Sequence, residues 1–192
     1  MEKALIRSTQ NRIHPHKFAL WLVFAAVIMM FTGFTSAYVV RQAQGNFLEF
    51  KIPNLFFYNT ATLIISSILL HGSYEAFKRG FELRYKWLMV GAFVTGIVFI
   101  ILQYLGWVEL SKGGVTITGN PAGSFFYLIP FVHLLHVLGG LVVLVIALVH
   151  AFYLKYKVTE RRKIRFQLTL QYWHFVDILW IYLMVFFVAM NS

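Results

Sequence analysis

Five long apolar stretches constrain this 192-residue sequence more than any other feature. They lie at residues 18–40, 55–77, 87–108, 124–153 and 169–190. A helix needs about 20 apolar residues to cross roughly 30 Å of hydrocarbon, so each stretch is long enough to be a transmembrane helix. Only 12% of the residues are charged, whereas a soluble domain carries about 25%. We therefore predict an all-α membrane protein in which residues 1–192 form a single domain of five transmembrane helices.

The basic residues outside these stretches predict the orientation of the chain. The N-terminal tail, the segment after the second stretch and the segment after the fourth share one side of the membrane, and they hold 14 of the 17 lysines and arginines. These are Lys3, Arg7, Arg12, Lys17, Lys78, Arg79, Arg84, Lys86, Lys155, Lys157, Arg161, Arg162, Lys163 and Arg165. Because lysine and arginine accumulate on the cytoplasmic side, we expect a cytoplasmic N-terminus and a periplasmic C-terminus. The same residues offer a surface to anionic lipids, so we expect membrane phospholipids, and no nucleic acid, as their partners.

Ionisable residues inside the stretches are the candidates for function, because burying them in a membrane is costly. Three pairs have the spacing of neighbours on one helix face: His71 with Glu75, His133 with His136, and His174 with Asp177. We expect these faces to turn toward other helices or a partner rather than toward lipid tails. Glu75 lies one turn from Lys78 and Arg79, which favours a surface ion pair at headgroup level.

Two interpretations of the buried histidines remain open. Imidazole is a common metal ligand, and His136 and His174, on different helices, could form a haem ligand pair. A haem–copper centre needs more histidines than the three deepest ones here, and no repeated histidine box of a di-iron enzyme is present. Hydrogen bonding between helices is the interpretation that we favour, with lipid-headgroup or proton-related roles as further possibilities. We expect Asp177 to bond to a neighbour, a histidine of the fourth stretch being the candidate.

Two tryptophans of the fifth stretch, Trp173 and Trp180, lie seven residues apart and therefore on one helix face. We expect both to pack in the core, where their indole N–H groups need hydrogen-bond partners. Small residues that allow close helix contact occur in the third and fourth stretches: Gly91, Gly96, Gly139 and Gly140.

Several motifs together resemble one family. The run 172–177, Tyr-Trp-His-Phe-Val-Asp, followed by Trp180, resembles the last-helix signature of subunit III of haem–copper oxidases. The segment 126–140, with its two histidines, is similar to the penultimate helix of that family. The resemblance extends to further residues in the expected order: Phe31, Tyr38, Arg41, Asn59, Thr60, Leu63, Ser66, Ser67, Gln103, Trp107 and Glu109.

The resemblance implies a short, five-helix bacterial form of subunit III, which lies in the cytoplasmic (inner) membrane. It also implies a subunit of a cytochrome c oxidase complex with no catalytic residues, haem or copper of its own. Haems and copper are expected in the partners, the catalytic subunit I and subunit II. By the same resemblance, the chain packs on subunit I, binds phospholipid and supports proton uptake during electron transfer to oxygen.

Three positions depart from the family pattern. Val27 and Gly106 stand where the family often has glutamates, and His150 aligns with a basic residue that contacts lipid phosphate. Whether a proton-collecting role survives without these glutamates stays open, and lipid contact through His150 would be weaker or would depend on pH. Other function classes stay open: a quinol oxidase subunit III, a related accessory protein of nitric-oxide reductase, or a stand-alone membrane redox protein that uses the buried His and Asp residues.

Overall fold

The structure is a computed structural model that describes residues 15–47 and 50–191. These residues form five α-helices: α2 (Pro15–Ala43), α3 (Leu55–Arg79), α4 (Glu82–Lys112), α5 (Pro121–Tyr153) and α6 (Glu160–Met190). All five are long and apolar enough to cross a membrane. The prediction of an all-helical protein with five such helices is therefore confirmed. Lys3, Arg7 and Arg12, which entered the orientation argument, lie outside the described residues.

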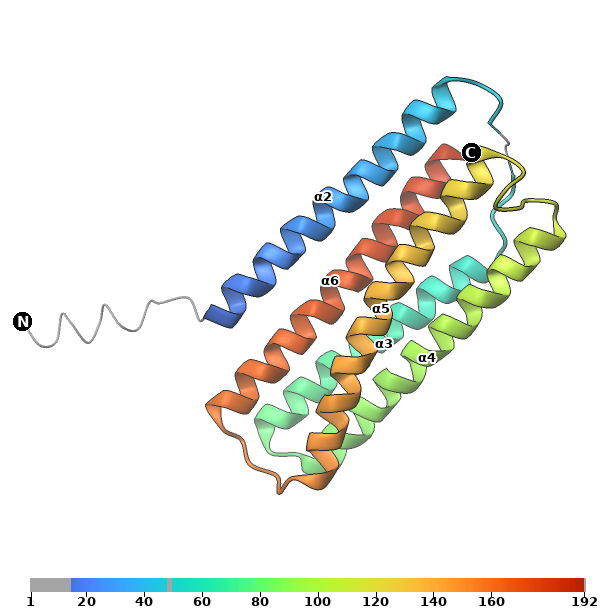
Figure 1. The fold of residues 1–192 in the computed structure, drawn as a ribbon. Helices are drawn as coiled ribbons and strands as arrows, with labels where there is room; N and C mark the ends of the chain where they lie inside the picture. Colours follow the sequence, from blue (N-terminus) through green and yellow to red (C-terminus); the bar gives the residue numbers. More distant parts are fainter. Residues whose placement is uncertain (1–14, 48–49, 192) are drawn as a thin grey trace, which may run out of the picture.

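The helices α3, α4, α5 and α6 form a four-helix bundle, and α2 packs against α5 and α6 (Figure 1). All helices run nearly along one long axis, so the connections gather at two ends. We call the end with the α3–α4 turn and the α5–α6 loop, residues 154–159, the basic end. The other end, with the α2–α3 and α4–α5 connections, is the opposite end.

The helix ends follow local capping chemistry rather than hydropathy. Gly80 stops α3 in a left-handed conformation with φ +87°, which suits a residue without a Cβ. Thr159 caps α6 by accepting a hydrogen bond from the Arg162 N–H at 3.4 Å. Helix α6 therefore starts at Glu160, nine residues before the apolar stretch expected from 169.

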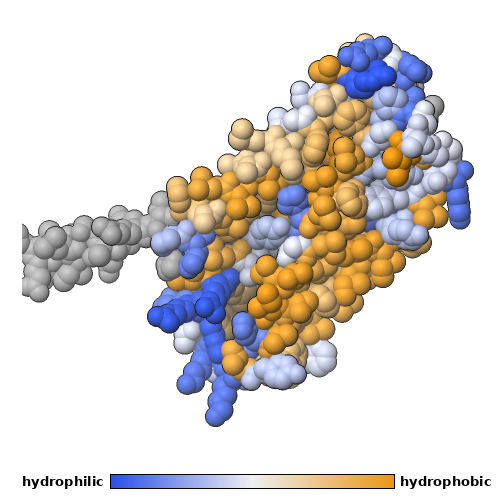
Figure 2. Space-filling view, viewed as in Figure 1, coloured by the Kyte–Doolittle hydropathy of each residue, from blue (hydrophilic) through white to orange (hydrophobic). Residues whose placement is uncertain are grey.

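The core is aromatic and the outer surface is apolar. Tyr38 is fully buried and its ring lies among Phe47, Phe125, Phe186 and Phe187, at centroid distances of 4.9–6.0 Å. Many large aliphatic and aromatic side chains are exposed along the helices. Figure 2 shows hydrophobic residues along the flank and hydrophilic residues gathered at the two ends. Exposure of such an apolar flank to water is unfavourable, whereas the hydrocarbon of a bilayer solvates it.

Candidate functional site: polar seam and basic-end cavity

Polar side chains of α3 and α6 meet where these two helices touch. The Ser67 Oγ lies 2.5 Å from the His174 Nδ1, and Ser67 also interacts with the carboxylate of Asp177. The rings of His71 and His174 are 5.7 Å apart between centroids. One turn further along α3, Glu75 forms a salt bridge with Lys78, at 2.6 Å, and both side chains are partly exposed. We call the contact of Ser67, His71, His174 and Asp177 the polar seam.

The seam corrects one expectation about Asp177. We expected a histidine of the fourth stretch as its partner, but its neighbour is Ser67 of α3. One carboxylate oxygen, Oδ1, accepts no hydrogen bond from the described residues, and the residue is only 7% exposed. His174, one turn from Asp177, turns its Nδ1 toward Ser67 instead. A serine hydroxyl both donates and accepts, so Ser67 can pair with either tautomer of His174.

Nearer the opposite end than the polar seam, two further hydrogen bonds join α3 to its neighbours α6 and α4. The Trp180 indole Nε1 donates to the Thr60 hydroxyl at 3.0 Å, which gives this buried tryptophan the partner that we expected. The Asn59 amide donates to the Gln103 side-chain oxygen at 2.6 Å and joins α3 to α4. Thr60 and Ser67 match the family pattern in the sequence, but they were not among the candidate site residues, because position along one helix does not show which group on another helix a hydroxyl contacts.

Trp173 lies in the core between two glycines of neighbouring helices. A Cβ added to Gly96 of α4 would lie 3.2 Å from the Trp173 Cη2, and one added to Gly140 of α5 would lie 3.0 Å from its Cζ3. The indole therefore fits only because both positions lack a side chain. Its Nε1 has no hydrogen-bond partner among the described residues, which differs from the expectation for a buried tryptophan.

The two histidines of α5 have different surroundings. His133 is fully buried against Trp180, with ring centroids 5.0 Å apart, and its ring nitrogens contact no hydrogen-bond partner among the described residues. The His136 Nδ1 lies 2.8 Å from the Val132 carbonyl of its own helix. The Tyr172 hydroxyl of α6 donates to the His136 carbonyl at 2.9 Å. Across residues 15–47 and 50–191, no three His, Cys, Asp or Glu side chains group closely enough to hold a metal ion.

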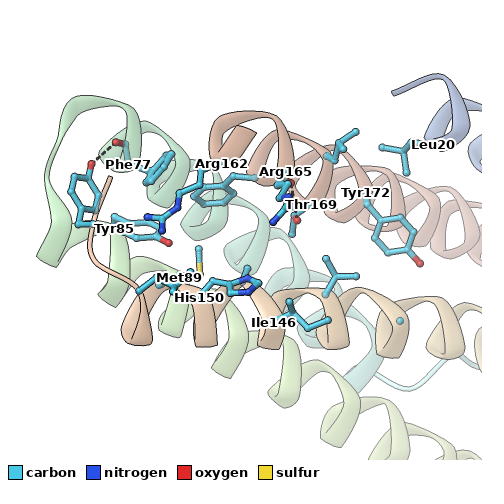
Figure 3. Close-up of a pocket in the computed structure, with 18 residues that line it drawn as sticks. Leu20, Phe77, Tyr85, Met89, Ile146, His150, Arg162, Arg165, Thr169 and Tyr172 are labelled. Atoms are coloured by element: carbon cyan, nitrogen blue, oxygen red, sulfur yellow. Dashed lines mark hydrogen bonds between the residues drawn. The ribbon is translucent and has the colours of Figure 1, made fainter. Parts of the chain in front are cut away.

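A cavity of about 710 Å³ opens at the basic end, between the ends of α5 and α6 and the α5–α6 loop. Arg162 and Arg165 of α6 lie across it from His150 of α5 (Figure 3). Arg162 donates to the Lys155 carbonyl at 2.8 Å and so holds the loop. The other lining residues are mainly apolar or aromatic, and the described ones include no acidic side chain. The cavity thus combines cationic groups with an apolar wall.

Tyr156 closes the rim of this cavity. Its hydroxyl donates to the Phe77 carbonyl at 2.7 Å, which ties the α5–α6 loop to the end of α3. Burial raises the pKa of the Tyr156 phenol, and the nearby Glu82 carboxylate raises it further. The hydroxyl therefore stays protonated, and keeps donating, throughout the physiological range.

This arrangement defines a multi-pass helical membrane protein in which several buried polar side chains connect neighbouring helices. The model of the cytochrome c oxidase subunit III family matches residues 16–192, and the chain belongs to that family. It is 31% identical over 174 residues to a probable cytochrome c oxidase subunit 3 of Nocardia farcinica, covering 84% of this chain and 80% of the relative. It is 32% identical, with the same coverage, to the protein of that name from Mycobacterium bovis. Cytochrome c oxidase subunit 3 of Pelomedusa subrufa is 28% identical over 190 residues, covering 92% of this chain and 69% of the relative.

Proposed function

We propose that this chain is a non-catalytic subunit of a respiratory haem–copper oxidase, packed on the catalytic subunit I beside subunit II. The observation that carries the proposal is the use of the ionisable groups inside the helices. His174 is engaged with Ser67, and His136 with its own helix. The first contact joins α6 to α3 and the second lies within α5, so we assign these side chains to structure, and the haems and copper to the partner chains.

Purification of the tagged protein in mild detergent tests this function. We expect subunits I and II to migrate with it and to carry the haem absorption. Recovery of the chain alone from respiring cells would contradict the proposal. Visible haem absorption of the separated chain, lost in His136→Ala but kept in His150→Ala, would support a stand-alone redox protein instead. The haem types and subunits of the recovered complex also distinguish a cytochrome c oxidase from a quinol oxidase or a nitric-oxide reductase system.

The basic-end cavity supports a second part of the proposal, the binding of an anionic phospholipid. Arg165 makes no side-chain hydrogen bond to the described residues, so its guanidinium is free to bind a phosphate. The volume of about 710 Å³ lies within the roughly 300–1,000 Å³ typical of small-molecule sites. The apolar wall is suited to an acyl chain. His150 lies across the cavity from the two arginines, where its ring can form a further hydrogen bond to the same phosphate.

A matched pair of variants tests the lipid site. Arg165→Gln removes a cation that lines the cavity, whereas Arg161→Gln removes an exposed cation of the same helix that does not line it. We expect the first variant to lose tightly bound anionic phospholipid from the purified complex and the second to retain it. Equal lipid content in the two variants would count against a specific site.

We propose the orientation that the charge distribution predicts, with the basic end in the cytoplasm of a bacterial cell and the opposite end in the periplasm. Reporter fusions at Arg162 and Gly114 test it, because Arg162 lies in the first turn of α6 and Gly114 in the α4–α5 connection, at the two ends of the bundle. A periplasmic reporter that is active at Arg162 would reverse the assignment.

Support of proton uptake by the catalytic subunit completes the proposal. Val27 is buried, and Gly106 packs against the Phe56 ring with no space for a side chain. These two positions therefore hold no proton-exchanging group in this chain. Proton exchange at the membrane surface would instead involve groups near the basic end, where Glu75 is partly exposed.

A further inference from the structure

One face of α6 lies open between α2 and α3. Helix α6 contacts α2 through Phe175, which stacks on Phe24 at 4.1 Å, and through Tyr182, which bonds to Thr35. It contacts α3 through Trp180. At 3.6 residues per turn, a third face of α6 falls between these two contacts. That face consists of His174, Ile178, Ile181 and Val185.

The open face combines exposed aliphatic side chains with a histidine. Ile178 is 66% exposed and Val185 is 64% exposed, whereas His174 is half-buried at the polar seam. Beside them on α3, the exposed His71 makes no hydrogen bond to the described residues. His71 lies eight residues before the end of α3, which is about 12 Å along the helix at roughly 1.5 Å per residue. A neutral imidazole carries one donor and one acceptor, and lipid tails satisfy neither.

The exposed stripe of α5 provides a contrast. Leu138, Val142, Val145 and Val149 lie on one face of that helix, are exposed, and are all aliphatic. This is the pattern of a face that contacts acyl chains. The face that contains His71 and His174 departs from it at a depth where polar groups normally face protein.

We propose that His71, His174, Ile178, Ile181 and Val185, together the docking face, bind a transmembrane helix of the oxidase's catalytic subunit. This inference rests on the proposed function and adds where the partner binds. The aliphatic residues pack against the apolar side of that helix. The two histidines meet a hydrogen-bonding side chain on it.

The positive charge at the basic end favours such a partner over a second copy of this chain. The segments at the basic end carry many more lysines and arginines than acidic residues. A second copy inserted in the same orientation would bring its basic end beside the first, and like charges at the membrane surface repel each other. A helix from another subunit that carries a hydrogen-bond donor complements the face.

Cysteine reactivity tests the docking face, because the chain contains no cysteine of its own. The probes are Ile178→Cys and His71→Cys, and the control is Val145→Cys. Val145, like His71, lies eight residues before the basic end of its helix. Each variant is purified as the complex and treated with N-ethylmaleimide, and the modified fraction of this chain is followed in time. The measurement is repeated after the partner has been removed with stronger detergent.

We expect the two probes to react at least about tenfold more slowly than Val145→Cys in the intact complex, because interface cores pack as densely as protein interiors. Removal of the partner should restore their reactivity. Equal rates at all three positions in an intact complex would overturn the docking face while leaving the proposed function standing. A disulfide between two copies at Ile178→Cys would assign the face to self-association instead. Failure to recover any complex would contradict the proposed function itself, and the docking face with it.

Discussion

The fit of Trp173 between two glycines leads to a quantitative prediction about Gly140. In Gly140→Ala, the new Cβ would lie 3.0 and 3.1 Å from two indole carbons and 3.1 Å from the Tyr172 ring. Favourable carbon contacts lie at about 3.5–4.0 Å, so the indole or a helix must move. Overpacking of this kind costs about 1–3 kcal/mol.

The adjacent Gly139 provides a matched control. A Cβ at this position would lie 3.6 Å from the Tyr172 hydroxyl, an ordinary contact. Both substitutions gain about 1 kcal/mol of helix propensity, so this contribution cancels in the comparison. We therefore expect Gly140→Ala to be less stable than Gly139→Ala by about 1–3 kcal/mol.

Reversible unfolding in mixed micelles, followed by circular dichroism over increasing fractions of denaturing detergent, measures this difference. Intrinsic fluorescence recorded in the same titration reports whether the environment of the tryptophans changes. Equal free energies of unfolding for the two variants would refute the tight fit of Trp173 between α4 and α5.

Three further predictions follow from single contacts. Asn59→Ala should lower the free energy of unfolding by about 1–3 kcal/mol, because the buried Gln103 side-chain oxygen loses its hydrogen bond. The double variant with Gln103→Leu should recover part of this loss in the same titration. Tyr156→Phe should cost about 1 kcal/mol at neutral pH through loss of the bond to the Phe77 carbonyl. Burial raises the pKa of Tyr156 in the folded chain. The hydroxyl therefore makes its full contribution to stability below about pH 10, the pKa of an unfolded tyrosine, and loses it as the pH rises through the folded pKa. Unchanged stability of Tyr156→Phe would count against the bond. In the complex, Asp177→Leu should retain haem and near-normal initial oxygen consumption. Its activity should decline faster over many turnovers than that of Asp177→Asn. Zero initial activity with intact haem would assign Asp177 to the chemistry.

The existence of the five helices could be predicted from hydropathy alone, but their ends could not. An apolar stretch stops where charged residues begin, whereas a helix continues until its backbone is capped. The charged run after Thr159 therefore forms the first two turns of α6, although it lies outside the stretch expected from 169. The side chain of Thr159, not the change in polarity, sets that boundary.

The spacing along the sequence predicted which candidate side chains share a face of one helix, but not which side chains of other helices they contact. Spacing places His174 and Asp177 on one side of α6, and both lie at its contact with α3. Their partner, Ser67, depends on the rotation of α3 about its axis, which the spacing within α6 does not encode. The same limit applies to His133 and His136, which share a spacing but not an environment. Core packing around Trp180 buries the first, while the second lies three residues further on, about 60° around the helix.

The basic-end cavity shows a different limit. The sequence analysis singled out His150, whereas it counted the arginines as a signal of orientation and as part of a general surface for anionic lipids, not as residues of a cavity. Arg162 and Arg165 line the cavity because Thr159 starts α6 early and brings this charged turn beside α5. A charge count along the chain cannot distinguish an arginine in solvent from one that faces a cavity.

The uneven attachment of α2 has a consequence for the order of assembly. Its buried residues, Val27, Phe31, Thr35 and Tyr38, run toward the opposite end, where Gln42 also donates to the Met190 carbonyl at 3.2 Å. A transmembrane helix satisfies its own backbone hydrogen bonds inside lipid. Helix α2 can therefore insert as an independent unit and join the α3–α6 bundle afterwards, closing from the opposite end toward the basic end. Dissociation of α2 from the bundle would break these contacts in the reverse order without unfolding any helix.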